Sequence, residues 1–249
     1  MKNSQAENCL KRLKDYFGSK DNSILAPVSY PDSIEYASEE WISYVFYSCL
    51  LDYGMRSKIY HKNLIATYDQ HAEIFDSKFI MTNMEPSVLL EIMKSSIHPR
   101  YPNIAIQKWI KLSTYLSKYD NLENTISKFD SFSELEKLVY DSKCYGQKTG
   151  GLLLRELKDA GICQAKDDME SIPLDRHDIE ISYLNGLIDT TKPSSKDLKE
   201  LSSIWIQAGK KLHMTPSEVD KYLWELGTRH CVKKLCDTCP LNDICQKKG

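Results

Sequence analysis

The sequence predicts an all-α fold. Apolar residues recur at helical spacing in segments such as 104–119, whereas the strict alternation typical of β-strands is scarce. Gly and Pro residues stand at the ends of these segments, as they do at helix boundaries. The chain has 249 residues, of which 41% are hydrophobic and 27% charged. It is therefore long enough to bury a core in one large domain or two small ones.

Capping signals place several of the helix ends. Ser38 precedes two glutamates, which suits an N-cap followed by acids at the positive end of the helix dipole. Ser131 and Glu134 form a capping box, and Gly161 is a stop signal. We see no internal repeat and no low-complexity tract. The expected helices, in chain order, are 6–17, 38–52, 55–71, 87–96, 104–119, 131–140, 150–161, one within 172–188, 195–212 and 215–227.

Charge and hydropathy exclude some classes of protein. The longest run low in charge, Trp41–Leu51, is too short to span a bilayer, and the N-terminus shows no secretory signal. We therefore expect a cytoplasmic protein without a membrane partner, in a compartment where thiols stay reduced. The net charge of −2 gives no global indication of a nucleic-acid partner, so DNA binding would require local basic patches.

Four of the eight cysteines lie close together near the C-terminal end. Cys231, Cys236, Cys239 and Cys245 follow one another with four, two and five residues between them. In a reducing compartment such a group indicates a metal site rather than disulfides. A single Cys-x2-Cys pair between two isolated cysteines favours a [4Fe–4S] cluster, with zinc as the alternative and four free thiols as a third.

The same stretch resembles a known family. WELGTRHC…CDTCPLNDIC is similar to the C-terminal cluster loop of the helix–hairpin–helix DNA glycosylases of the endonuclease III and adenine glycosylase group. That family usually has six residues in the first gap, where this chain has four, while the last two gaps match. The shortened loop carries Lys233 and Lys234, which the resemblance places against DNA phosphates.

A second motif resembles the hairpin of this family. YGQKTGG is similar to the end of its Gly-x-Gly-x-Lys-Thr-Ala signature, with Gly146, Lys148 and Thr149 matching and Cys144 replacing the first glycine. Such a hairpin directs backbone N–H groups at a DNA phosphate from a helix N-terminus and reads no sequence. The resemblance implies that the backbone of double-stranded DNA is contacted by Gly146, Gln147, Thr149 and Gly150.

The third motif supplies an acid. In IPLDRHDIEISYLNGLI, Asp175 and His177 match the Val-Asp-x-His-x-x-Arg stretch of the family, while Ile181 and Ser182 occupy the neighbourhood of its arginine. The 27 residues from Lys148 to Asp175 make this chain more similar to the archaeal 8-oxoguanine glycosylases. By itself, Asp175 is expected to be an ordinary N-cap, which is compatible with catalysis. We expect His177 to orient the turn.

The resemblance implies base excision. Asp175 would stabilise the positive charge that develops on the sugar when an N-glycosidic bond breaks. Water as the nucleophile would leave an abasic site, whereas a Lys148 amine would form a Schiff base and could act as an AP lyase. The alternative role of Lys148 is a phosphate contact. The base must first leave the helical stack, and a wedge residue usually fills the gap.

Candidates for the wedge and the base pocket come from the part of the chain that least resembles the family. Tyr53, Met55 and Arg56 follow the first barrel helix, and Arg100 could reach a DNA strand or the opposite base. Trp41 could stack on a flipped base, although an aromatic stripe on a helix is more often core.

By resemblance the fold has two lobes. Residues 35–160 would form a helical barrel with the hairpin, and residues 1–34 with 161–249 a second helical domain with the cluster loop. We expect a monomer that associates with the nucleoid when bound to DNA. The substrate is either an oxidised or mispaired base, in repair, or a hypermodified base of foreign DNA, in antiviral defence. The alternatives are a non-catalytic DNA-binding protein and a zinc-bound interaction module.

Overall fold

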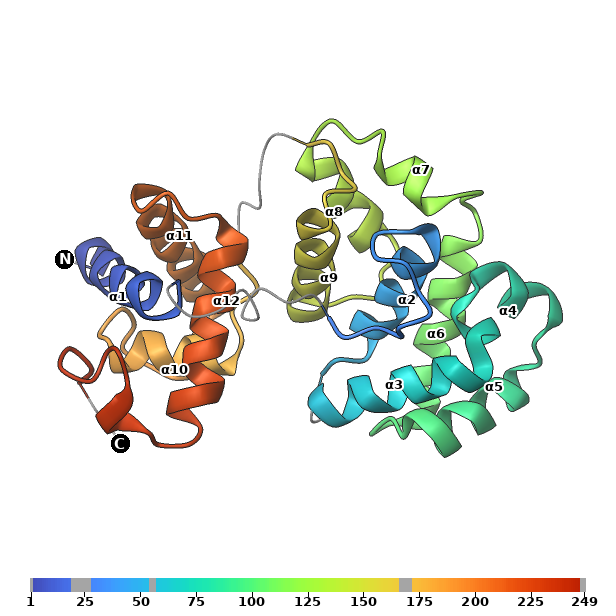
Figure 1. Ribbon diagram of the computed structural model, residues 1–249, viewed down its shortest axis with the longest axis horizontal. Helices are drawn as coiled ribbons and strands as arrows, with labels where there is room; N and C mark the ends of the chain where they lie inside the picture. The colour runs from blue at the N-terminus through green and yellow to red at the C-terminus, as the bar shows by residue number, and fades with distance from the viewer. Residues whose placement is uncertain (1, 19–27, 54–56, 166–171, 247–249) are drawn as a thin grey trace. The chain divides into compact units, whose positions relative to one another are not determined.

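The computed structural model describes residues 2–18, 28–53, 57–165 and 172–246, which separate into two compact units (Figure 1). Unit 1 comprises Met1–Ala26 and Asp168–Gly249, and unit 2 comprises Pro27–Asp167. Every element that the described residues form is helical, and none of these helices is long and apolar enough to cross a bilayer.

The helical elements follow one another in the order given by their numbers. Unit 1 contains α1 (Lys2–Phe17), α10 (Arg176–Leu184), α11 (Ser195–Lys211), α12 (Pro216–Leu226), η4 (Gly227–Cys231) and η5 (Cys236–Thr238). Unit 2 contains α2 (Glu39–Leu50), α3 (Ser57–His71), η2 (Ala72–Phe75), α4 (Ser77–Asn83), α5 (Pro86–Ile92), η3 (Met93–Ile97), α6 (Pro102–Leu116), α7 (Leu122–Ile126), α8 (Phe132–Asp141) and α9 (Gln147–Asp159).

The borders of the units differ from the expected 34/35 and 160/161 because the flanking segments pack onto unit 2. The N–H of Val28 donates to the buried Glu156 carboxylate at 2.7 Å, and Ile34 is buried. On the other side, the Cys163 thiol donates to the Phe129 carbonyl at 3.7 Å. These contacts assign both segments to unit 2.

Helix α2 is the central element of unit 2, which explains the uncharged run in the sequence. Tyr47 stacks on Trp109 of α6 with ring centroids 4.7 Å apart, and the Tyr47 and Ser113 hydroxyls form a hydrogen bond of 2.7 Å. The Trp109 indole N–H donates to the Ile74 carbonyl at 2.7 Å. Trp41 is fully enclosed on the same helix, where its ring meets Tyr36 edge-on. The structure therefore places Trp41 in the core and not on a surface that a flipped base could reach.

The capping signals in the sequence are confirmed. The Ser38 hydroxyl accepts the Trp41 N–H at 3.2 Å, and the Glu134 carboxylate accepts the Ser131 N–H at 3.1 Å. Gly161 follows α9 with a left-handed φ of 71°, so it ends that helix in the conformation that glycine adopts most readily.

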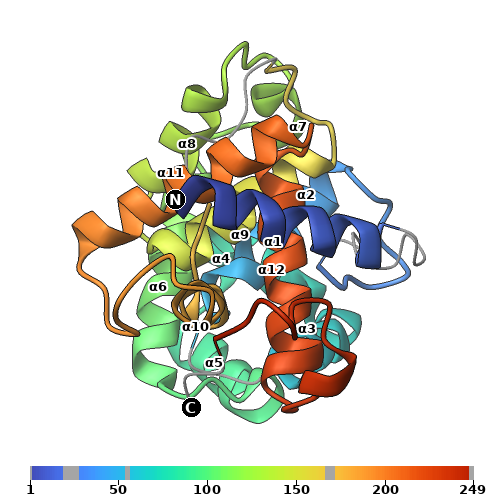
Figure 2. The same ribbon diagram turned by 90° about the vertical axis from the view of Figure 1, so that its left-hand side faces the viewer.

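In unit 1, α1 lies across α11 and α12 (Figure 2). Leu10 and Leu13 of α1 are fully buried in a core that includes Trp205 of α11. The Trp205 indole N–H donates to the Ser182 hydroxyl of α10 at 2.9 Å. The two ends of the described chain thus fold into one core.

We predict that Trp109→Ala lowers the free energy of unfolding of unit 2 by about 3–5 kcal/mol, because a buried ring and its hydrogen bond are lost. Val88→Ala on α5, where the side chain is 50% exposed, should change it by less than about 0.5 kcal/mol. Urea unfolding of the two variants measures the difference, and equal midpoints would contradict the central role of α2 and α6.

Candidate active site

The hairpin between α8 and α9 is pinned by short polar contacts. Lys143 holds a left-handed φ of 53°, and the Lys111 amine of α6 donates to its carbonyl at 2.8 Å. The Cys144 N–H donates to the Ser142 hydroxyl at 3.2 Å and its thiol to the Ser142 carbonyl at 3.3 Å. The left-handed turn residue is thus Lys143, which explains why Cys144 can replace a family glycine.

The motif that follows divides into residues that close the hairpin and residues that face solvent. Thr149 and Gly150 are buried, and the Thr149 hydroxyl accepts the Gly146 N–H at 3.3 Å. A Cβ on Gly150 would lie 2.5 Å from the Tyr140 ring, so glycine allows α8 and α9 to approach closely. Thr149 and Gly150 are therefore packed inside unit 2, whereas Gly146, Gln147 and Lys148 are exposed at the N-terminus of α9.

Lys148 is the second residue of α9. Its amine donates to the Asp52 backbone carbonyl at 3.5 Å, just beyond the end of α2. The Asp52 carboxylate is buried and lies 3.6 Å from the His61 Nε2 atom of α3. The structure thereby holds the amine at the surface of unit 2, beside the C-terminal end of α2.

Of the wedge candidates, Tyr53 is half-buried and follows Asp52. The Lys108 amine lies 4.5 Å from the centroid of the Tyr53 ring. Met55 and Arg56 fall outside the described residues. Arg100 is exposed, with its guanidinium 5.2 Å from the Tyr101 ring centroid. Basic side chains of unit 2 therefore lie beside aromatic rings. Their contacts do not identify Tyr53 or Arg100 as a residue that binds a DNA base.

Asp175 is the N-cap of α10, as the sequence indicated. Its Oδ1 atom accepts the His177 N–H at 2.6 Å and the Asp178 N–H at 3.2 Å. The residue is half-buried. Both N–H groups bond to Oδ1, and neither bonds to Oδ2. The capping role of Asp175 is therefore compatible with a reactive one.

Asp178 completes this turn, and the sequence reasoning missed it. Its Oδ2 atom accepts the Asp175 N–H at 2.6 Å, and the residue is 1% exposed. Burial raises the pKa of Asp178 well above its ordinary value, and the carboxylates of Asp220 and Asp175 raise it further. The signal was an acid three residues after an N-cap, which is the spacing of a capping box.

Gly227 connects the same turn to the cysteine loop. A Cβ on Gly227 would lie 2.5 Å from the His177 Cβ atom, which is closer than two such atoms can approach. The glycine is buried at the start of η4, four residues before Cys231. The glycine before the first cysteine of the loop therefore has a packing function: it lets α10 begin directly against η4.

The four cysteine thiols of the C-terminal loop lie close enough to influence one another. Burial raises the pKa of the Cys231 thiol to about 12, and Cys239, Glu180, Cys245 and Cys236 add to the rise. Within the described ranges, no three His, Cys, Asp or Glu side chains are arranged to hold a single metal ion. Four thiols gathered by one loop are the donor set of either zinc or a cubane cluster, so the residues fit such a group.

The loop is anchored on unit 1 by contacts distant in sequence. The Arg12 guanidinium of α1 meets the Asp243 carboxylate at 2.5 Å, and the Gln246 N–H donates to the Leu184 carbonyl at 2.8 Å. Leu241 is buried in the unit 1 core. Lys233 and Lys234 remain exposed on this loop, as a role in phosphate binding requires.

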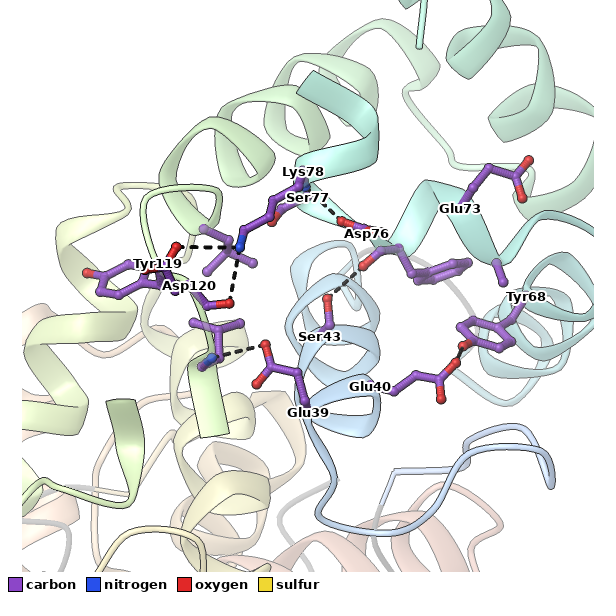
Figure 3. Close-up of a pocket in the computed structure, with 14 residues that line it drawn as sticks. Glu39, Glu40, Ser43, Tyr68, Glu73, Asp76, Ser77, Lys78, Tyr119 and Asp120 are labelled. Carbon is purple, nitrogen blue, oxygen red and sulfur yellow. Dashed lines mark hydrogen bonds and ion pairs between the residues drawn. The ribbon is translucent and has the colours of Figure 1, made fainter. Parts of the chain in front are cut away.

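Unit 2 also contains a hollow of about 510 Å³ lined by several acids (Figure 3). Its carboxylates are engaged locally: Glu39 accepts the Leu122 and Glu123 N–H groups, and Asp76 caps α4. The Lys78 amine donates to the Asp120 carbonyl. An acidic hollow would repel a phosphate backbone, so we assign these residues to the architecture of unit 2.

No protein-family model matches this chain, and no curated protein matches it. Solved structures do. The 8-oxoguanine glycosylase/lyase of Methanocaldococcus jannaschii, in complex with a 15mer DNA containing 8-oxoguanine, superposes with a TM-score of 0.60 at 18% identity, covering 89% of this chain and 98% of that chain. The 8-oxoguanine DNA glycosylase of Thermotoga maritima gives 0.60 at 19% identity, covering 89% and 96%. The chain therefore has the fold of these helical DNA glycosylases, which confirms the predicted fold class.

We predict that Gly227→Ala displaces the first turn of α10, since the added methyl group meets the His177 Cβ atom. Overpacking of this kind destabilises by about 1–3 kcal/mol, here in unit 1. Gly146→Ala is the matched control: its Cβ would have no neighbour within 4 Å and its φ is −88°. Thermal unfolding compares the two. An equal melting temperature for both variants would contradict the close approach of α10 and η4.

Proposed function

We propose that this protein is a DNA glycosylase that excises an oxidised purine of the 8-oxoguanine class. The observation that carries the proposal is the fold shared with 8-oxoguanine glycosylases. Within that fold, Lys148 lies on the exposed first turn of α9 in unit 2, and the Asp175 carboxylate is held by two N–H groups at the start of α10 in unit 1. The substrate class comes from the solved structures with this fold.

Asp175 has the electrostatic role. Breaking the bond between C1′ and the base leaves positive charge on the sugar, and a fixed carboxylate stabilises that charge. Two N–H groups hold Oδ1 in place, so little reorganisation is needed when the charge develops. The ionised form of Asp175 is the active one in this proposal.

Lys148 has the nucleophilic role. The amine lone pair forms a bond to C1′ while the bond between C1′ and the base breaks. The base leaves with the electron pair of the broken bond and takes a proton from solvent. Proton loss from the nitrogen and opening of the sugar ring give a Schiff base. Removal of a C2′ proton then expels the 3′ phosphate, which is the lyase reaction.

DNA is held by its backbone in this proposal. The exposed N-terminus of α9 offers N–H groups that lack partners within the helix. Gly146 and Gln147 on the hairpin, and Lys233 and Lys234 on the cysteine loop, are exposed and suit phosphate contacts. We propose a double-stranded substrate bound by a monomer.

We also propose a [4Fe–4S] cluster on the four C-terminal cysteines, Cys231, Cys236, Cys239 and Cys245. The spacing of these cysteines and the anchoring of their loop on unit 1 support this assignment. Glycosidic cleavage transfers no electrons, so a bound cluster would supply a structural cross-link. The loop would then present Lys233 and Lys234 as a fixed pair.

We predict that Asp175→Asn lowers the single-turnover rate of 8-oxoguanine excision by at least about 100-fold, because a neutral amide cannot stabilise the sugar cation. Lys148→Gln should abolish the covalent adduct trapped by borohydride. Lys118→Gln, an equal change of charge at an exposed site of unit 2, is the control and should leave both readouts unchanged. DNA affinity is measured alongside for every variant.

The same assay separates the alternatives. Excision by Asp175→Asn at the wild-type rate would contradict the role assigned to Asp175. Binding of DNA by the wild type without excision of any base on the panel would contradict the enzyme and favour a DNA-binding protein. Excision without an adduct would mean that water attacks and that Lys148 contacts phosphate. A substrate panel with mispaired and hypermodified bases tests the substrate class: cleavage of the hypermodified base alone would contradict the 8-oxoguanine assignment and favour defence against foreign DNA.

For the cluster, we expect about four irons and four acid-labile sulfides per chain in protein purified without oxygen. Cys236→Ser should lower this content and the stability of unit 1. Cys163→Ser in unit 2 is the matched control, because serine can donate to the Phe129 carbonyl as the thiol does. A colourless sample containing zinc would contradict the cluster and support the zinc alternative.

A further inference from the structure

Asp178 is a buried acid beside the residue to which we assign the charge-stabilising role. Both belong to the first turn of α10, where Asp175 caps the helix and Asp178 bonds back to the Asp175 N–H at 2.6 Å. The reciprocal bonds make the position of the Asp175 backbone depend on the Asp178 side chain. The family motif that this stretch resembles leaves this position open, so the resemblance assigns no role to Asp178.

The second oxygen of Asp178 shows which form of the acid this site accommodates. Oδ1 is buried, and no hydrogen-bond donor reaches it among the described residues. An ionised oxygen left buried without a donor is strongly unfavourable. A protonated oxygen carries no charge and is itself a donor, and the Asp175 carboxylate lies close enough to help raise the pKa of Asp178.

Neighbouring charge favours the same form. Asp220 of α12 is buried next to Asp178, and the half-buried Asp175 lies on its other side. Two adjacent carboxylates cannot both ionise easily, and the more deeply buried one keeps the proton. Asp178 is 1% exposed and Asp175 is half-buried, so Asp178 is the one that stays neutral.

We propose that Asp178 is a positioning residue for Asp175: as a neutral carboxylic acid, it accepts the Asp175 N–H on one oxygen and donates its proton to the Asp175 carboxylate from the other. This inference rests on the proposed function for its effect on rate. It explains how the Asp175 side chain keeps one orientation at the start of α10. The proton stays on Asp178 throughout the reaction.

The first test uses the fact that asparagine reproduces a neutral aspartic acid. Asp178→Asn keeps a carbonyl acceptor and adds an N–H donor, so single-turnover excision should remain within about 3-fold of wild type. Asp178→Ala removes both bonds, and excision should fall by about 10- to 100-fold, as expected when a reactive group is misplaced by a fraction of an ångström to an ångström. DNA affinity should be the same in both variants, because the buried side chain at position 178 is not among the proposed phosphate contacts.

Two kinetic results would overturn the proposal. Excision by folded Asp178→Ala at the wild-type rate would mean that Asp178 does not position Asp175. An Asp178→Asn variant that is folded and binds DNA, but is as slow as Asp178→Ala, would mean that the ionised form is required. Thermal unfolding identifies variants that are slow merely because they fail to fold.

The second test does not depend on activity. Infrared difference spectra of wild type and Asp178→Asn at neutral pH should show the carbonyl band of one neutral carboxylic acid in the wild type, and Asp175→Asn should retain that band. Its absence from the wild type overturns the inference whether or not the protein excises a base. Presence of the band in a protein that excises no base would instead show that the proposed function has failed while the neutral acid is real.

Discussion

The pair of reciprocal hydrogen bonds at the start of α10 is the constraint on which the proposed site depends. Asp175 caps the helix through Oδ1, and Asp178 returns a bond to the Asp175 N–H. A loop could hold a carboxylate only loosely, whereas this turn fixes both the backbone and the side chain. Gly227 then fixes the turn itself, because it allows His177 to pack directly against η4. The position of one oxygen is thereby set by contacts from α10 and η4.

Local sequence signals predicted much of the fold. Capping residues such as Ser38 and the stop at Gly161 determine their own helix ends through bonds within a few residues, so they can be recognised without tertiary information. The short helices α4 and α7 were missed, since a stretch of five to seven residues shows little periodicity. The borders between the units differ from the predicted ones because contacts distant in sequence, made by Val28 and Cys163, attach the flanking segments to unit 2.

The candidate site residues also divide into those that a local motif predicts and those that depend on long-range packing. Asp175 and Lys148 could be identified because each occupies a motif, and the structure places Asp175 at a helix start and Lys148 on an exposed first turn. Asp178 could not be ranked above other acids, because its burial depends on α12. Trp41 failed as a pocket residue for the converse reason: an aromatic side chain on a helix has the same local signature whether it faces substrate or core. Motifs therefore indicate candidate groups for a reaction, and packing identifies the residues that hold them in place.

Unit 1 is built from the two ends of the described chain, and this arrangement has a consequence for biosynthesis. The apolar face of α1 packs on α11 and α12, which leave the ribosome only after all of unit 2 has been made. Unit 2 is continuous in sequence and can fold as it emerges. During that interval α1 has no partner for Leu10 and Leu13. The emerging chain therefore exposes the apolar face of α1 until α11 and α12 have been made, and unit 1 closes only after unit 2 is complete.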